Sequence, residues 1–167
     1  MAFTYSKLAE VTLASSASSI SFNNIPQNYN DLKVVCSVRA VTGAVQYVNL
    51  SFNGSTASFT SRGLEGDGAS AYSYTSTFLG GVFVASTYTA NTFANNEIYI
   101  PNYTSSNYKS YSVDSVTENN ATTSFATLLA GLWSNTTAIT SITMVLATGA
   151  SIAANSTATL YGVKAEV

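Results

Sequence analysis

Three tyrosines are the side chains of this sequence best suited to contact a ligand. Tyr72, Tyr74 and Tyr88 lie in or near segments whose Gly, Ser and Thr content predicts loops. A phenol offers an apolar face to a sugar ring and a hydroxyl group to its edge, so these residues are candidates for contact with a host glycan or another partner. Tyrosine is also common on strands and at subunit interfaces, which is the alternative role for each of them.

Two carboxylates stand close together in the run Glu65-Gly66-Asp67-Gly68. Carboxylates in a glycine-rich turn can bind calcium, but this spacing matches no known ligand loop, so a solvated loop is the simpler interpretation and we predict no metal site. A pair of carboxylates can also serve a glycosidase. With eight acidic residues in the chain, however, a chance pair is easy to find.

The sequence lacks the residues on which most catalytic mechanisms depend. The sequence contains no histidine, a single cysteine, and none of the glycine-rich phosphate loops or nucleophile elbows that mark cofactor-dependent enzymes and hydrolases. We therefore predict that the protein is not an enzyme and uses no cofactor. Cys36 alternates with Leu32, Val34 and Val38, which predicts a buried apolar side chain rather than a reactive thiol.

The composition indicates strands and an uncharged polar surface. Hydrophobic residues make up 46% of the chain and charged residues only 8%, against about 25% charged in an ordinary soluble domain. Ser and Thr together number 47 and Asn 15, a mixture that favours strands and turns. The net charge of -2 and the scattered Lys and Arg residues argue against nucleic acid as a partner. The sequence predicts neither an export signal nor a membrane partner, because no apolar stretch is long enough.

The strand signal is strongest where apolar and polar residues alternate. Between positions 32 and 41, Leu32, Val34, Cys36 and Val38 should face a core. A second strand over 47–52 should place Val48, Leu50 and Phe52 on one face. It ends at Asn53-Gly54, which predicts a tight hairpin with a return strand over 57–62.

The remaining chain predicts an all-β fold. Phe125–Trp133 has apolar residues on both faces, which suggests a central strand covered on both sides, with a short helix as the alternative. The segment Gly63–Tyr74 is interpreted as a surface loop. Further strands are expected at 7–13, 19–22, 78–85, 97–100, 108–116, 139–146 and 157–163. We predict one domain over 1–167, an antiparallel β-sandwich of about eight to ten strands with a jelly-roll arrangement.

Packing and turn signatures along nearly the whole chain resemble those of a known family. The segments that carry the resemblance are Thr4–Ala9, Ser19–Phe22, Ile25–Leu32, Ser51–Gly54, Asn96–Tyr103, Lys109-Ser110, Gly131–Trp133 and Ala158–Val163. Together they resemble small structural proteins of tailed-bacteriophage virions, and related modules also occur in tail fibres.

The resemblance implies a virion protein without enzymatic activity, assembled in the host cytoplasm and often trimeric. Its partners would be other capsid or tail proteins and further copies of itself. A chain with nothing long on either side of the sandwich is expected to be a capsid decoration protein or a small appendage. The alternative is a tail-fibre or spike module that binds host surface glycans.

Overall fold

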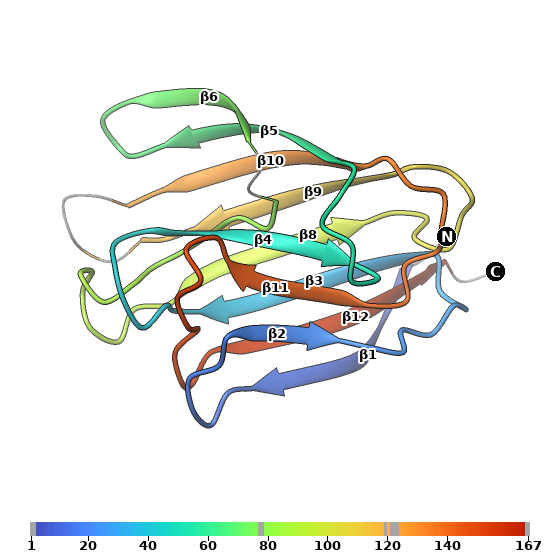
Figure 1. Cartoon of the computed structure of the whole chain (residues 1–167), viewed down its shortest axis with the longest axis horizontal. Coiled ribbons are helices and arrows are strands. Elements are labelled where there is room, and N and C mark those ends of the chain that lie inside the picture. The colour runs from blue at the N-terminus through green and yellow to red at the C-terminus, as the bar shows by residue number, and fades with distance from the viewer. Residues whose placement is uncertain (1–2, 77–78, 119, 121–123, 166–167) are drawn as a thin grey trace.

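The computed structural model describes residues 3–76, 79–118, 120 and 124–165, which form an all-β sandwich (Figure 1). Twelve strands are defined within these residues: β1 Phe3–Thr12, β2 Ser19–Phe22, β3 Asp31–Val38, β4 Gln46–Phe52, β5 Phe59–Gly66, β6 Ala71–Ser76, β7 Val82–Phe83, β8 Ala94–Ile100, β9 Lys109–Val116, β10 Ala126–Trp133, β11 Ile142–Leu146 and β12 Thr157–Ala165. The part of the chain that is described contains no helix long and apolar enough to cross a membrane.

The two sheets differ in size. The larger has the order β1-β12-β3-β8-β9-β10-β5-β6, and the smaller has the order β2-β11-β4-β7. All neighbouring strands are antiparallel, and at one edge of the larger sheet Phe3 of β1 lies opposite Ala165 of β12. Figure 1 shows the smaller sheet in front of the lower part of the larger one, while β5 and β6 lie above β4. The prediction of an antiparallel β-sandwich is confirmed.

Alternation of apolar and polar residues places the core between the sheets. In β3, Leu32, Val34, Cys36 and Val38 are buried, while Ser37 is exposed, as the sequence predicts. The same holds for the apolar residues of β4. Burial raises the pKa of the Cys36 thiol to about 12, so this side chain behaves as a small apolar residue.

The prediction for 125–133 is partly wrong. A strand forms here and not a helix, but β10 is covered on one face only: Leu129 and Trp133 are buried, whereas Leu128 is 59% exposed. The segment is apolar at both inward and outward positions because the exposed face of β10 also carries apolar side chains, such as that of Leu128. An apolar side chain on a strand is therefore not by itself a sign of burial.

The predicted hairpin after Asn53-Gly54 is also wrong, although the turn itself forms. Both residues have positive φ, and the amide of Ser55 donates to the carbonyl of Phe52 at 2.9 Å. The chain then leaves for the other sheet, where β5 pairs with β6 and β10. Strand β4 pairs instead with β11 and β7.

The strand count and the loop prediction need correction as well. The described residues form twelve strands and not the eight to ten expected, and Gly63–Tyr74 is not a loop but most of the β5–β6 hairpin. The jelly-roll arrangement is not confirmed, since sheets of eight and four strands differ from the two balanced sheets of an eight-stranded jelly roll.

Trp133 belongs to an aromatic cluster in the core. Its ring lies 5.5 Å from Phe52 and 6.0 Å from Phe59, measured between centroids, and Tyr111 packs edge-on against Phe52 at 5.7 Å. These rings join the last residues of β4 and β10 to the start of β5, so they fasten the smaller sheet to the larger one. Trp133 itself is 1% exposed, so it is a core residue.

Candidate functional site

The β5–β6 hairpin carries two of the three candidate tyrosines and closes through a compact turn. The amide of Asp67 donates to the carbonyl of Ser70 at 3.1 Å, and Gly68 takes the positive φ of 88° that a two-residue hairpin turn needs. The Asp67 carboxylate accepts the amides of Ser70 at 2.7 Å and Ala69 at 2.9 Å, and the Tyr72 hydroxyl at 3.1 Å. These hydrogen bonds, that of Ser70 first, lower the pKa of Asp67.

Tyr72 and Tyr74 lie on one face of β6, two residues apart, beside a buried carboxylate. Glu65 is only 8% exposed, and its Oε2 accepts the Thr127 hydroxyl at 3.0 Å and that of Tyr74 at 3.5 Å. The Tyr74 ring covers Gly63, where a Cβ atom would come within 2.4 Å of Cζ. Burial and then the charge of Glu65 raise the pKa of Tyr74 to about 12. The Tyr74 ring is thus held against Gly63 with its hydroxyl group on Glu65, whereas Tyr72 is half exposed.

Tyr47 on β4 is also affected by the charge of Glu65. Burial raises the pKa of Tyr47, with smaller contributions from Glu65 and Tyr88, so Tyr47 lies within electrostatic reach of both. Tyr88 itself is partly buried and packs against the core. Tyr47 is a further tyrosine that the charge of Glu65 reaches, and residue type and spacing did not mark it as a candidate. Its position on β4 next to a buried Val48 would have predicted only an outward-facing strand residue.

Arg39 fixes the segment that carries Tyr88. Its guanidinium donates to the carbonyl oxygens of Tyr88 at 3.1 Å, Thr89 at 3.0 Å and Thr92 at 2.8 Å. The amide of Tyr88 also donates to the carbonyl of Ala85 at 3.1 Å. Tyr88 therefore lies in a turn with several anchors, not in an unsupported loop.

The two carboxylates of the acidic run serve different parts of the hairpin. Glu65 points to the buried side, where Thr127 binds it, whereas the Asp67 carboxylate caps the turn. The interpretation of this run as a solvated loop is wrong for Glu65, which lies on β5. Within the described residues, no three His, Cys, Asp or Glu side chains come together in a group that could hold a metal ion.

One cation is buried near the aromatic cluster. Lys109 is 1% exposed, and its Nζ donates to the carbonyl oxygens of Asn107 at 2.6 Å and Asn135 at 3.3 Å. It lies 6.0 Å from the centre of the Trp133 ring, and burial lowers its pKa. Both carbonyl partners are in the turns that flank β9 and β10, so we assign Lys109 a structural role.

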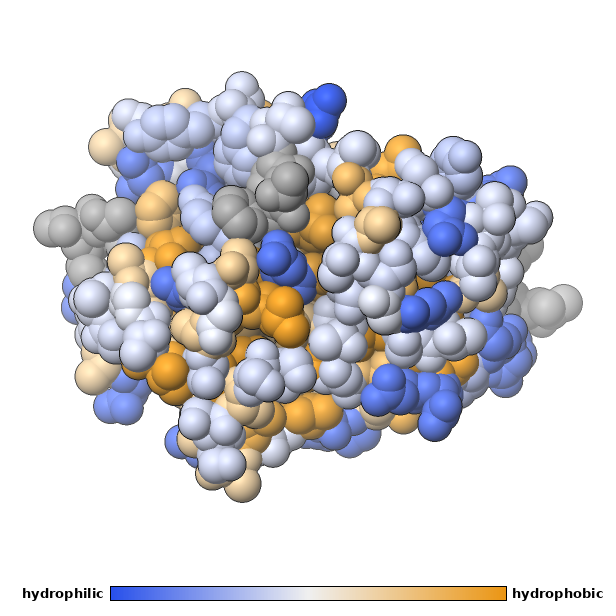
Figure 2. Space-filling model, in the orientation of Figure 1, coloured by the Kyte–Doolittle hydropathy of each residue, from blue (hydrophilic) through white to orange (hydrophobic). Residues whose placement is uncertain are grey.

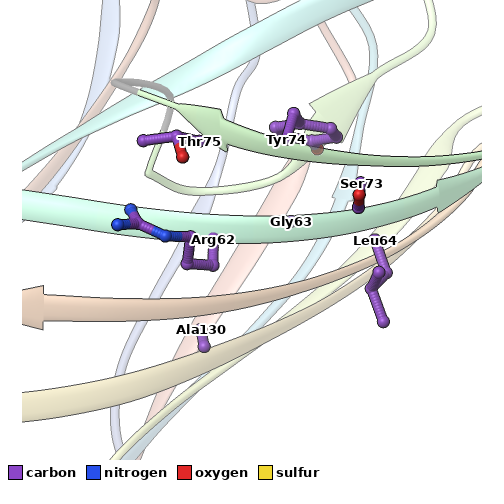
Figure 3. A pocket seen from close by; sticks show the side chains of 7 residues that line it. All are labelled: Arg62, Gly63, Leu64, Ser73, Tyr74, Thr75 and Ala130. Carbon is purple, nitrogen blue, oxygen red and sulfur yellow. The ribbon is translucent and has the colours of Figure 1, made fainter.

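The outer face of the larger sheet is shallow and partly apolar. Leu64 and Leu128 face each other across β5 and β10 and are 60% and 59% exposed. They border a depression of about 310 Å³, and a second one of about 430 Å³ lies beside Leu64 (Figure 3). Figure 3 labels the residues that line the second depression: Arg62, Gly63, Leu64, Ser73, Tyr74, Thr75 and Ala130. Neither depression is enclosed, so this face suits a broad contact more than a small ligand.

The opposite side of the molecule is mostly of intermediate hydropathy. Figure 2 shows pale surface over much of this side, as expected from the Ser and Thr content, with strongly hydrophilic groups scattered over it. Apolar surface is visible in the recess between the β5–β6 part and the β4 layer and in further patches in the centre and lower part of this side.

Comparison with known proteins found no match among family models, curated proteins or solved structures.

Proposed function

We propose that this protein is a non-enzymatic structural protein of a bacteriophage virion, a capsid decoration protein or a small appendage that binds and stabilises the particle surface. The observation that carries the proposal is the outer face of the eight-stranded sheet, a broad surface with exposed Leu64 and Leu128 and shallow depressions. Such a surface suits contact with other virion proteins over a wide area. The sequence resemblance supports the same assignment and implies a homotrimer.

Attachment to the particle would depend on uncharged area. The chain has only 14 ionisable Lys, Arg, Asp and Glu side chains, and two ion pairs occur among the described residues, Lys7 with Glu10 and Lys33 with Glu97. Binding to the shell should therefore change little between 0.1 M and 1 M salt, although the screening length falls from about 10 Å to about 3 Å. A charge-steered interface would weaken strongly over this range.

The test uses virions that lack the protein. We expect these particles to adsorb normally to host cells but to lose their genome at a lower temperature or under osmotic shock. Densitometry of complete virions should give hundreds of copies for a decoration protein and at most a few dozen for a fibre tip. Normal genome retention together with failed adsorption would reject the decoration role.

The second candidate is a tail-fibre or spike module that binds host glycans, and the Tyr72–Tyr74 face beside Glu65 favours it. An aromatic ring next to a carboxylate can contact a sugar face and accept its hydroxyl groups. If this role is right, Tyr72→Ala should abolish glycan binding measured by NMR titration. Tyr108→Ala is the matched control, since Tyr108 is 60% exposed and lies outside the hairpin. Equal binding by both variants would reject the glycan site.

A further inference from the structure

The larger sheet ends in two edge strands that differ in chemistry. Edge strands expose unpaired backbone groups, and proteins commonly protect them with charges, proline or bulges. β1 carries the Lys7–Glu10 ion pair at 2.7 Å and an irregular register between Lys7 and Ala9. β6 has the sequence Ala-Tyr-Ser-Tyr-Thr-Ser, without charge or proline, and pairs with β5 in continuous register over Ala71–Ser76.

The outward backbone groups of β6 follow from its pairing with β5. Hydrogen-bonded and non-hydrogen-bonded pairs alternate along an antiparallel ladder. Since the Asp67 amide bonds to the Ser70 carbonyl, the hydrogen-bonded pairs further along β6 involve Tyr72 and Tyr74. The amides and carbonyls of the residues between them, Ala71, Ser73 and Thr75, point away from β5. No hydrogen bond joins these groups to another described residue.

We propose that β6 is a self-association edge, which pairs antiparallel with β6 of a second copy. The three outward residues are centred on Ser73, so a twofold axis at this position places Ser73 opposite Ser73 of the second copy. It also places Ala71 opposite the second copy's Thr75. Every outward amide then meets an outward carbonyl in both copies, and one sheet runs through the dimer.

The side chains agree with this register. On the inner face, Tyr72 of each copy is opposite Tyr74 of the other, at a non-hydrogen-bonded position where side chains approach most closely. On the outer face, small residues meet at the junction, and no ionisable group of β6 opposes its own copy across the axis. The exposed Leu64 lies on the adjacent strand β5, one strand in from the junction. The occupant that fits this edge is therefore a second copy of the chain.

This pairing goes beyond the proposed role in the virion and changes its expected stoichiometry. A twofold contact is closed and gives an even number of copies. The trimer that the resemblance implies would need a separate contact, and the two together would give a hexamer.

The experiment compares two lysine variants at exposed serines of the same sheet. Light scattering of the wild-type protein at tens of micromolar should give an even multiple of 17.5 kDa. Ser73→Lys places two like charges at the twofold axis and should halve this mass, whereas Ser112→Lys, on the interior strand β9, should leave it unchanged. Circular dichroism checks that both variants remain folded.

Hydrogen exchange on the wild-type protein gives a second readout that needs no variant. The amides of Ala71, Ser73 and Thr75 should become protected as the protein concentration rises, while those of Tyr72 and Tyr74 are protected at every concentration. A monomeric or odd-numbered wild type, a folded Ser73→Lys variant that keeps the wild-type mass, or outward amides that exchange freely at high concentration would each overturn the proposal. The virion experiments above are independent of this result, since a monomeric chain could still bind the shell.

Discussion

The ring of Tyr111 lies directly against Gly131 on the neighbouring strand, so that a Cβ atom at position 131 would come within 2.1 Å of the tyrosine Cζ. Tyr111 is 4% exposed and packs against Phe52 and Phe59, which leaves its ring no free direction in which to move. Glycine at this position is therefore a packing requirement of the aromatic cluster.

Gly131→Ala should lower the free energy of unfolding by about 1–3 kcal/mol, because the added methyl group overpacks the core. Urea denaturation measures the change. Gly66→Ala is the matched control on β5, where the new Cβ would have its nearest neighbour at 3.9 Å. The control should change stability by less than about 1 kcal/mol and could raise it through the unfolded state. Equal losses in both variants would contradict the packing argument.

Removal of the Tyr111 hydroxyl should stabilise the protein. This hydroxyl is buried without a hydrogen-bond partner among the described residues, and burial raises its pKa. An unsatisfied buried polar group costs about 1–3 kcal/mol, so we expect Tyr111→Phe to raise the free energy of unfolding by about 1 kcal/mol. Tyr103→Phe should have the opposite sign, because the Tyr103 hydroxyl donates to the carbonyl of Pro26. The same sign in both variants would refute the prediction.

Alkaline pH should weaken the fold through groups that stay protonated only when folded. Cys36 has a pKa raised from 9.0 to about 12 by burial, and Tyr99 is raised from 10.0 to about 12, first by burial and then by its hydrogen bond to Asp31. Between the unfolded pKa values of 9.0 and 10.0 and the folded values of about 12, the unfolded chain loses these protons while the folded chain keeps them. The stabilisation is therefore complete below about pH 9 and is lost as the pH rises toward 12.

Urea midpoints at about pH 8, 9.5 and 11 measure this loss. The variant Cys36→Ala removes one of the titrating groups, so its stability should be lower at pH 8 but should fall less steeply above pH 9. A thiol reagent at pH 8 should leave Cys36 unmodified in the folded protein and modify it in urea. Rapid modification of the folded protein would contradict the burial argument.

Loss of the Arg39 guanidinium should loosen the turn that holds Tyr88. Arg39→Met retains the apolar stem but cannot donate to the carbonyls of Tyr88, Thr89 and Thr92. We expect faster hydrogen exchange at the amides of Tyr88 and Thr92, while the amides of β3 change little. Arg62→Met is the control, since Arg62 donates only to the neighbouring carbonyl of Ser61 among the described residues. Unchanged exchange in Arg39→Met would show that other contacts hold the turn.

Local patterns predicted strands but not their partners. Alternation identified the buried face of β3 correctly because each inward residue is specified by its own polarity. The Asn53-Gly54 turn formed as predicted, yet β4 pairs with β11. Asn53 helps to stabilise this pairing. Its side chain donates to the carbonyl of Ala138 and accepts the amide of Thr140. These partners are more than 80 positions away in the sequence, where no local signal reaches.

For the same reason, only part of the candidate site could be predicted from the sequence. Tyr72, Tyr74 and Tyr88 could be selected by residue type, but the contribution of Tyr47 and the burial of Glu65 depend on packing between strands from both sheets. The Gly and Ser content of 63–74 suggested a loop. Asp67-Gly68 within that run was the signal that could have predicted a hairpin turn instead.

The pairing of β1 with β12 also determines from which part of the molecule a terminal tether would leave. Because Phe3 and Ala165 are register partners, a tether joined to either end leaves from the same corner of the molecule (Figure 1). β6 is the opposite edge of that sheet, so a copy anchored by either end would present β6 away from its anchor. The same geometry should permit circular permutation, with a short linker between the original ends and new ends opened at an exposed turn such as Gly68-Ala69.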